Sequence, residues 1–324
     1  MTSLLRLSSL ITILALLVLH AAPAQAAAAY VPRPALIAPL AASRLALDVV
    51  DTGARYIAVG ERGQILASDD GRSWSQQPVP VRSALTAVSF ADADHGWAVG
   101  HDAVILATAD GGKTWNLQNY APELEKPLLD VLFIDARRGY AIGAFGLFLV
   151  TEDGGGNWTP MRSPVVDEDE LNLYAIARLG NGDLLITGEQ GRLLLSNDDG
   201  QTWKRYRSPV NATLFGAAAI GARGALICGL RGNAYVSADV RSGGWKAIDT
   251  GSTAAFYGCA GIGDDRALLV GADGIILLAD LAARRVRRLK SPAGGAWSAL
   301  VPRKSGVVLA GERGLHLLGP VVGR

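Results

Sequence analysis

The 324-residue chain carries 31 basic and 30 acidic side chains, so its formal net charge is only +1. A balance this close to neutral excludes a protein that binds nucleic acid mainly through bulk positive charge. Hydrophobic residues make up 49% of the chain and 39 residues are glycine, a composition typical of many short strands joined by tight turns.

Residues 1–26 have the pattern of a secretory signal peptide. Arg6 is followed by a mostly apolar run from Leu10 to Leu19 and by the small-residue sequence Ala24-Gln25-Ala26, where we expect cleavage. The apolar run is too short to span a bilayer. We therefore expect one soluble domain over residues 27–324, exported to a bacterial periplasm and at most peripheral to the membrane.

A motif of about 40 residues then repeats seven times. Each copy is marked by a glycine, 40 to 45 residues after the one before: Gly60, Gly100, Gly143, Gly188, Gly229, Gly271 and Gly311. A constant period in this range indicates stacked supersecondary units.

One copy shows how the unit folds. Strands are predicted at Leu85–Phe90, Gly96–Gly100, Ala103–Ala109 and Thr114–Tyr120, each bounded by turn residues. The third strand of the repeats is almost continuously apolar, as expected where both faces of a sheet are covered. The sequence therefore predicts an all-β, seven-bladed propeller of four-stranded antiparallel blades.

The third and fourth strands are joined by an Asp-box, S/T-x-D-x-G-x-T-W. Near-complete copies contain Asp70, Asp110, Asp153 and Asp198. The carboxylate can accept hydrogen bonds from the turn that follows it, and the tryptophan can pack between blades. We interpret the boxes as structural, because residues repeated in every blade cannot all face one ligand.

The two ends of the chain predict how the ring closes. The last repeat has three strands and no fourth. The spare segment Ala29–Leu40 is expected to supply that fourth strand, on the outer edge, where its prolines are tolerated. Such a pairing would remove an open sheet edge.

Three features depart from the repeat. Residues 165–174 are an acidic insertion, interpreted as a solvated loop, with calcium or a basic partner as the alternative. Cys228 and Cys259 stand in slots that are apolar in the other repeats, and either buried thiols or a disulfide between neighbouring blades fits them. Arg284, Arg285, Arg287 and Arg288 stand at the outer edge of blade six, where they either prevent edge-to-edge association or form a basic docking site.

The turns between second and third strands are the candidate partner-binding sites, because variable loops on a rigid scaffold often carry recognition. Phe145 and Leu230 are apolar at positions expected to be wet, and arginines are frequent interface anchors. The candidate residues are Arg62, His101, Phe145, Leu230, Arg231 and Arg313. Ordinary polar turns remain the alternative for each of them.

No pattern of residues predicts a catalytic, cofactor or metal site. His95, His101 and His316 lie in different repeats without a closely spaced Cys or His. A sialidase-like glycoside hydrolase also uses Asp-boxes, but the arginine motif of that class has no counterpart. A hydrolase with paired carboxylates stays open as the alternative function, with these candidates: Asp48, Glu61, Asp130, Glu189, Asp264, Asp265, Asp273 and Glu312.

The segments 89–118 and 133–158 resemble the photosystem II stability/assembly factor family, and the resemblance extends over 45–318. It implies a secreted seven-bladed propeller without enzymatic activity that binds a partly assembled membrane-protein complex on its exported side. We expect no cofactor, and we expect the protein to be a monomer. Bacterial members also occur outside photosynthesis. There the partner implied is an envelope complex, such as an exporter.

Overall fold

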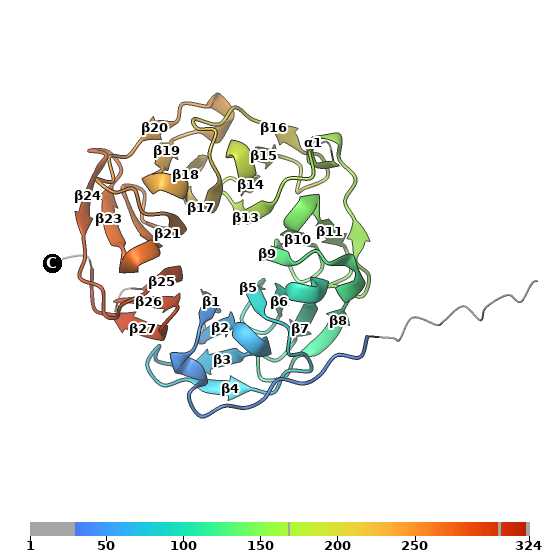
Figure 1. The fold of residues 1–324 in the computed structure, drawn as a ribbon. Coiled ribbons are helices and arrows are strands. Elements are labelled where there is room, and N and C mark those ends of the chain that lie inside the picture. Colours follow the sequence, from blue (N-terminus) through green and yellow to red (C-terminus); the bar gives the residue numbers. More distant parts are fainter. Residues whose placement is uncertain (1–29, 168, 304–305, 322–324) are drawn as a thin grey trace, which may run out of the picture. The chain divides into compact units, whose positions relative to one another are not determined.

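The structure, a computed structural model, describes residues 30–167, 169–303 and 306–321. The predicted signal peptide, 1–26, lies outside the described residues. From Pro32 onward the chain forms one compact unit, in which seven antiparallel sheets surround a central axis (Figure 1). The predicted seven-bladed propeller is confirmed.

Strands follow one another from the axis outward in every blade. The inner strands are β1 (Ala46–Asp51), β5 (Leu85–Phe90), β9 (Leu128–Phe133), β13 (Leu173–Arg178), β17 (Leu214–Ile220), β21 (Phe256–Ile262) and β25 (Trp297–Arg303). The second strands are β2 (Tyr56–Gly60), β6 (Gly96–Gly100), β10 (Gly139–Gly143), β14 (Leu184–Gly188), β18 (Gly224–Gly229), β22 (Arg266–Gly271) and β26 (Gly306–Gly311).

The third strands are β3 (Ile65–Ser68), β7 (Ile105–Thr108), β11 (Phe148–Thr151), β15 (Leu193–Ser196), β19 (Ala234–Ser237), β23 (Ile276–Asp280) and β27 (Gly314–Leu318). The outer strands are short: β4 (Ser75–Gln77), β8 (Asn116–Asn119), β12 (Thr159–Pro160), β16 (Lys204–Arg205), β20 (Lys246–Ala247) and β24 (Arg285–Arg288). Helical turns outside the strand 2–3 connections are η1 (Ala41–Ser43), η4 (Pro122–Leu124), α1 (Pro164–Asp167) and η8 (Val240–Ser242).

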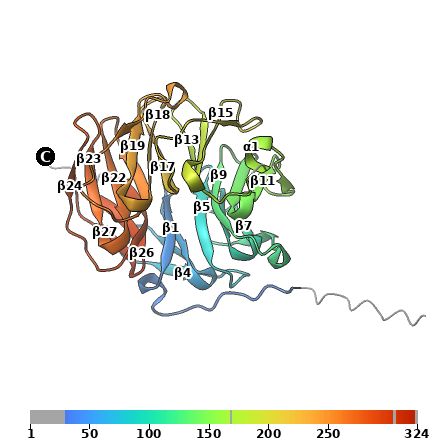
Figure 2. The same ribbon diagram turned by 45° about the horizontal axis from the view of Figure 1, so that its top comes forward.

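The core lies in the seams between blades. Every residue of β2, β6, β10 and β14 is buried, because neighbouring blades cover both faces of each sheet. At the first seam, for example, Ile57 and Val59 of blade one pack with Val88 and Leu106 of blade two. Figure 2 shows inner strands of neighbouring blades side by side along the axis.

Close approach between backbones explains the glycine that marks each repeat. A Cβ on Gly60 would overlap the carbonyl oxygen of Leu45, and a Cβ on Gly100 would overlap that of Ala84. The same overlap recurs at the other five repeat glycines. The position therefore admits only a residue without a side chain.

The ring closes differently from the expectation in one respect. Strands β25, β26 and β27 form a three-stranded sheet, and the expected fourth strand from residues 29–40 is not part of it. The N–H of Ala35 instead donates to the carbonyl of Val79, and the side chain of Gln76 binds the backbone of Leu36 and Ala38. These contacts hold the segment along the outside of blade one (Figure 1).

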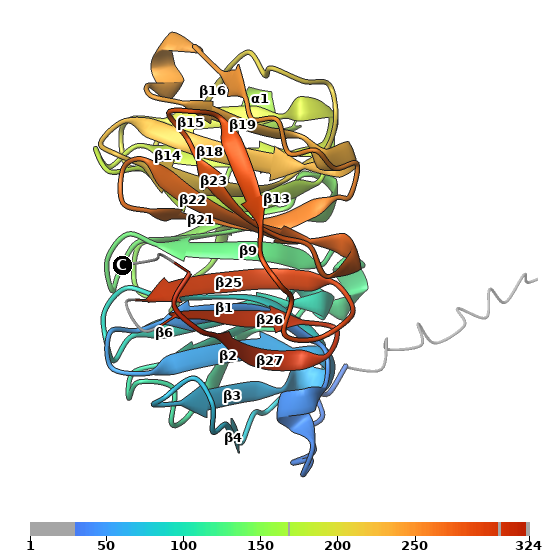
Figure 3. The ribbon, with the colours of Figure 1, turned by 90° about the vertical axis from the view of Figure 1, so that its left-hand side faces the viewer.

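Packing of side chains closes the ring. Strand β1 lies against β25 (Figure 3), and η1 lies against β27. Arg303 of β25 makes a two-point ion pair with Asp51 of β1, and its guanidinium stands 4.6 Å from the ring centroid of Tyr56. No helix in the described part of the chain is both long and apolar enough to cross a membrane.

Candidate partner-binding face and central channel

The turn between second and third strands has the same conformation in six blades. The six turns are η2 (Glu61–Gly63), η3 (His101–Ala103), η5 (Ala144–Gly146), η6 (Glu189–Gly191), η7 (Leu230–Gly232) and η9 (Ala272–Gly274). The middle residue of each is left-handed, with φ from 52° at Gln190 to 61° at Asp102. Because the blades are antiparallel meanders, these turns and Glu312–Arg313 share one face, which we call the tip face.

All six tip residues predicted from the sequence lie on this face. Arg62, His101, Arg231 and Arg313 are exposed, and the side chains of Phe145 and Leu230 are 53% and 37% exposed. The described residues that line the central channel come from the inner strands. The tip residues therefore do not line the channel, and their role in binding a partner stays a prediction.

Phe145 lines a pocket on the tip face. This pocket, of about 480 Å³, is lined by Leu124, Phe145, Phe148, Met161 and Val166, among others. Leu124, at 46% exposure, adds a second apolar side chain. Lys126, Arg162 and Glu170 supply the charged part of the lining.

Backbone contacts hold Phe145 in this position. Its N–H donates to Oδ1 of Asn172 over 2.8 Å, and its carbonyl accepts from Nζ of Lys126 over 3.2 Å. The same ammonium lies 6.0 Å from the phenyl centroid, at the outer limit of a cation–π contact. The ring is thus presented by a fixed backbone with a cation beside it.

The basic edge of blade six is an outermost strand, as predicted. Within β24, Arg285, Arg287 and Arg288 are exposed, and Arg284 precedes them. Val286 alternates inward onto the core. Nη2 of Arg287 donates to the carbonyl of Val321 over 3.3 Å. The exposed guanidinium groups form a row of positive charges along the outer edge of blade six.

A β-bulge in every inner strand builds the lining of the central channel. In each blade the register shifts by one residue at the same place, for example between Ala46 and Asp48. The residue displaced from the ladder turns toward the axis. The seven displaced residues, all of which line the channel, are Leu47, Thr86, Leu129, Tyr174, Phe215, Tyr257 and Ser298.

One side of this channel, about 220 Å³ in volume, is acidic. Asp48 accepts hydrogen bonds from the N–H groups of Val49 and Val88, and Asp130 accepts from Val131 and Ile176. Each carboxylate thereby joins its blade to the next. Loss of water raises the pKa of Asp48 to about 6 and that of Asp130 to about 8, where the charge of Asp48 adds to the effect.

The other side is aromatic. The ring of Phe215 lies between those of Tyr174 and Tyr257, at centroid distances of 4.9 and 5.6 Å in edge-to-face geometry. Edge-to-face contacts between aromatic rings add stability beyond that gained from burying their apolar surface. We call Tyr174, Phe215 and Tyr257 the aromatic arc. The channel therefore has a carboxylate half and an aromatic half.

The hydrolase alternative required convergent carboxylates and an arginine cluster. Asp48 and Asp130 do share the channel, but the described residues that line it include no arginine or lysine. All four of their carboxylate oxygens accept backbone N–H groups. Nor do three potential metal ligands among His, Cys, Asp and Glu gather anywhere in the described part of the chain.

The Asp-boxes lie on the face opposite the tips and have the predicted structural role. Asp110 accepts from the N–H of Thr114 over 2.9 Å and from its hydroxyl over 2.6 Å. The hydrogen bond from the Thr114 hydroxyl lowers the pKa of Asp110 to about 2. Trp115 is buried, and its indole N–H donates to the carbonyl of Gly112.

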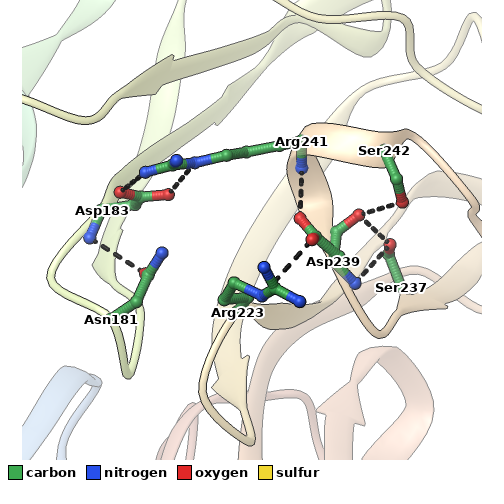
Figure 4. A network of polar contacts seen from close by, with 7 residues as sticks. All are labelled: Asn181, Asp183, Arg223, Ser237, Asp239, Arg241 and Ser242. Carbon is green, nitrogen blue, oxygen red and sulfur yellow. Dashed lines mark hydrogen bonds and ion pairs between the residues drawn. The ribbon is translucent and has the colours of Figure 1, made fainter.

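In blade five, the degenerate Asp-box that contains Ser237 and Asp239 takes part in a contact between blades. Asp239 accepts from the N–H of Arg241 over 3.0 Å, and the guanidinium of Arg241 makes two bonds, of 2.6 and 2.8 Å, to Asp183 of blade four (Figure 4). Arg223 lies 3.4 Å from Asp239. This network joins blade four to blade five through side chains.

The acidic insertion also binds its own chain. Asp169 pairs with the buried guanidinium of Arg192, which also donates to the carbonyl of Val165 over 2.6 Å. Asp169 nevertheless stays 41% exposed, so its ion pair does not contradict the interpretation of the segment as a solvated loop. Glu170 borders the pocket under Phe145.

Sequence reasoning missed two features that the fold brings together. The channel pair Asp48 and Asp130 appeared only among scattered carboxylates, and the aromatic arc was not singled out. Strand register places Asp48 and Asp130 at equivalent positions, opposite Val59 and Ile142. Counting back from the repeat glycines hides this, because Asp48 lies 12 residues before Gly60 whereas Asp130 lies 13 before Gly143. The pocket under Phe145 had no such signal, since Leu124 and Met161 come from connections outside the repeat.

Comparison with known proteins identifies the family. The family model described as "Photosynthesis system II assembly factor YCF48" matches residues 66–126 and 118–257. The chloroplastic photosystem II stability/assembly factor HCF136 of Guillardia theta is 37% identical over 159 residues, which are 47% of this chain and 40% of that protein. HCF136 of Cyanidioschyzon merolae is 35% identical over 79 residues, or 22% and 18% of the two chains. The matched segments span less than half of these relatives.

Two solved structures share the fold along nearly the whole ring. A structure titled "YCF48 bound to D1 peptide" aligns with a TM-score of 0.71 at 17% identity, covering 90% of this chain and 98% of its own. YCF48 from Cyanidioschyzon merolae aligns with a TM-score of 0.67 at 19% identity, covering 88% and 98%. With the family model matching more than half of its residues, the chain belongs to the YCF48 family of photosystem II assembly factors.

Proposed function

We propose that this protein is an exported assembly factor without enzymatic activity, which binds an exposed segment of a membrane-protein complex through its tip face. Family membership supports an assembly role, and the D1 peptide bound to a YCF48 supports a membrane protein as the class of partner. The predicted signal peptide supports a periplasmic location, where the protein acts as a monomer. The segment we expect carries an apolar side chain next to an acidic group, to match the pocket beside Lys126 and Arg162.

Phe145 is the observation that carries this proposal. Its φ of 53° belongs to the turn, since Gln190 has the same conformation with φ of 52°. A bulky aromatic residue is unfavourable in that conformation, and exposing more than half of its side chain gains nothing for folding. A residue that costs backbone energy and gains little from burial is best explained by a contact with another molecule.

The variant Phe145→Gln tests the proposal, because it installs the residue that the neighbouring blade uses in the same turn. We expect capture of the partner complex from solubilised membranes to weaken by about tenfold or more, as for a central interface anchor. The melting temperature should stay level or rise. A photo-crosslinker at position 145 should label a membrane protein, whereas one at Lys113, on the opposite face, should not.

Asp273→Gln is the matched control, since it changes the same turn position in blade six. It should capture the partner as well as the unchanged protein does. Equal capture by Phe145→Gln, or crosslinks from Lys113 in place of position 145, would remove the tip face of blade three as the binding surface.

A further inference from the structure

Cys228 and Cys259 face each other across the seam between blades five and six. Cys228 lies on β18 opposite Gly216, and Cys259 lies on β21. Their sulfur atoms lie 3.0 and 3.5 Å from the point where a Cβ on Gly216 would stand. Both thiols thus occupy the space left by one glycine, and each donates across the seam to a backbone carbonyl, Cys228 to Phe256 and Cys259 to Leu226.

The repeat symmetry explains why two cysteines 31 positions apart in number meet. In the register of the blades, Cys228 corresponds to Val59, and Cys259 corresponds to Val88. Val59 and Val88 pack together in the core of the first seam, and Cys228 and Cys259 pack together in that of the fifth. The contact is therefore a standard one of this ring, occupied here by two thiols.

We propose that Cys228 and Cys259 are a disulfide modification site that joins blade five covalently to blade six. Two S–H bonds break and one S–S bond forms. The two electrons and two protons pass to an organic disulfide, which is reduced to two thiols. An exported compartment would supply such a small disulfide, which can reach Cys259 from the channel.

The two thiols have different roles in this exchange. Cys259 is partly buried and borders the channel, so it meets the oxidant first and forms the mixed disulfide. Cys228 is fully buried. The contact with the Cys259 thiol, with burial, raises the pKa of Cys228 well above its ordinary value. Cys228 is therefore the thiol that attacks second, losing its proton as its sulfur displaces the other half of the mixed disulfide.

The bond would also fix part of the channel wall. Gly216 and Cys259 follow the bulges that hold Phe215 and Tyr257, two rings of the aromatic arc. Joining β18, which pairs with the strand of Phe215, to the strand of Tyr257 would limit the relative movement of the two rings. This inference is independent of the proposed function, and its test uses the purified protein alone.

The test is oxidation of the reduced, purified protein with cystamine, the small disulfide chosen to enter the channel. We expect the intact protein to lose the mass of two hydrogen atoms. Both of its thiols should disappear from a titration under denaturing conditions. The melting temperature should rise by roughly 5 °C, because the bond restricts the unfolded chain.

Valine variants are the controls, since Val59 and Val88 show that the fold accepts valine in both slots. Cys228→Val should stop at a cystamine adduct on Cys259, whereas Cys259→Val should react slowly or not at all. Neither melting temperature should depend on redox state. Two thiols that persist, two adducts per chain, a covalent dimer, or a crosslink without a rise in melting temperature would overturn the proposal.

Discussion

The carboxyl groups of Asp48 and Asp130, at the channel wall, are buried and have raised pKa values. Asp48 and Asp130 each satisfy two backbone N–H groups of the seams. At the same time, burial raises the pKa of both above the ordinary value of 3.8. Hydrogen bonding stabilises the ring at these seams, whereas ionisation of the same groups destabilises it.

Stability should therefore fall as the pH rises. Because the folded protein holds these protons to a higher pH than the unfolded chain does, the free energy of unfolding decreases between about pH 4 and pH 8. Asp130→Ala installs the residue that Ala87 and Ala175 supply at the same position. Its free energy of unfolding in urea should be lower at pH 5, and its decline up to pH 9 shallower.

Asp264→Ala, which removes an exposed carboxylate, should leave that decline as it is in the unchanged protein. If Asp130→Ala shows the same decline as well, the channel carboxyl groups do not titrate in this range.

Among the elements, β24 differs from the other outer strands. It belongs to blade six, which has no Asp-box before its outer strand, and three of the four residues of β24 are exposed arginines. Such charges would keep the edge from pairing with another sheet. The same row of cations fits an acidic surface of a partner.

Replacing Arg284, Arg285, Arg287 and Arg288 by Gln separates these two roles. If the edge is a docking site, capture of the partner complex should weaken, most at low ionic strength, while the melting temperature stays level. If the charges only prevent association, capture stays unchanged and sedimentation should show oligomers. Unchanged capture would dismiss the docking site.

The elements also show what the sequence could predict. Blade number, strand positions and box geometry follow from local patterns, since a turn such as Asp110–Thr114 makes its hydrogen bonds within five residues. Closure by Ala29–Leu40 could not be predicted correctly, because the competing partner, Gln76, gives no signal in the sequence. The pocket under Phe145 depends on irregular connections for the same reason.

At the scale of the whole molecule, the last seam depends on side chains, because the described residues of blade seven form three strands. Asp51 and Arg303, 22% and 32% exposed, are its polar link. Although burial opposes it, the hydrogen bond from Arg303 lowers the pKa of Asp51. A ring held this way should begin to open where blade one meets blade seven.

Arg303→Ala should lower the free energy of unfolding by roughly 1–2 kcal/mol, since it leaves Asp51 half-buried without its partner. Hydrogen exchange should increase first in β1 and β25. Arg55→Ala is the matched control, because its partner Asp69 is 77% exposed and such surface pairs contribute little. Equal losses in the two variants would contradict a special role for Arg303.

The bulge in each inner strand has a consequence for how this scaffold can diversify. A displaced residue such as Tyr174 or Ser298 takes no part in strand pairing, so its identity is free to change while the ladder stays intact. Seven such positions surround one axis, so substitutions there can change the polarity of the channel wall without disturbing the blades. Propellers with the same blades can thus differ in the ligands that their channels accept.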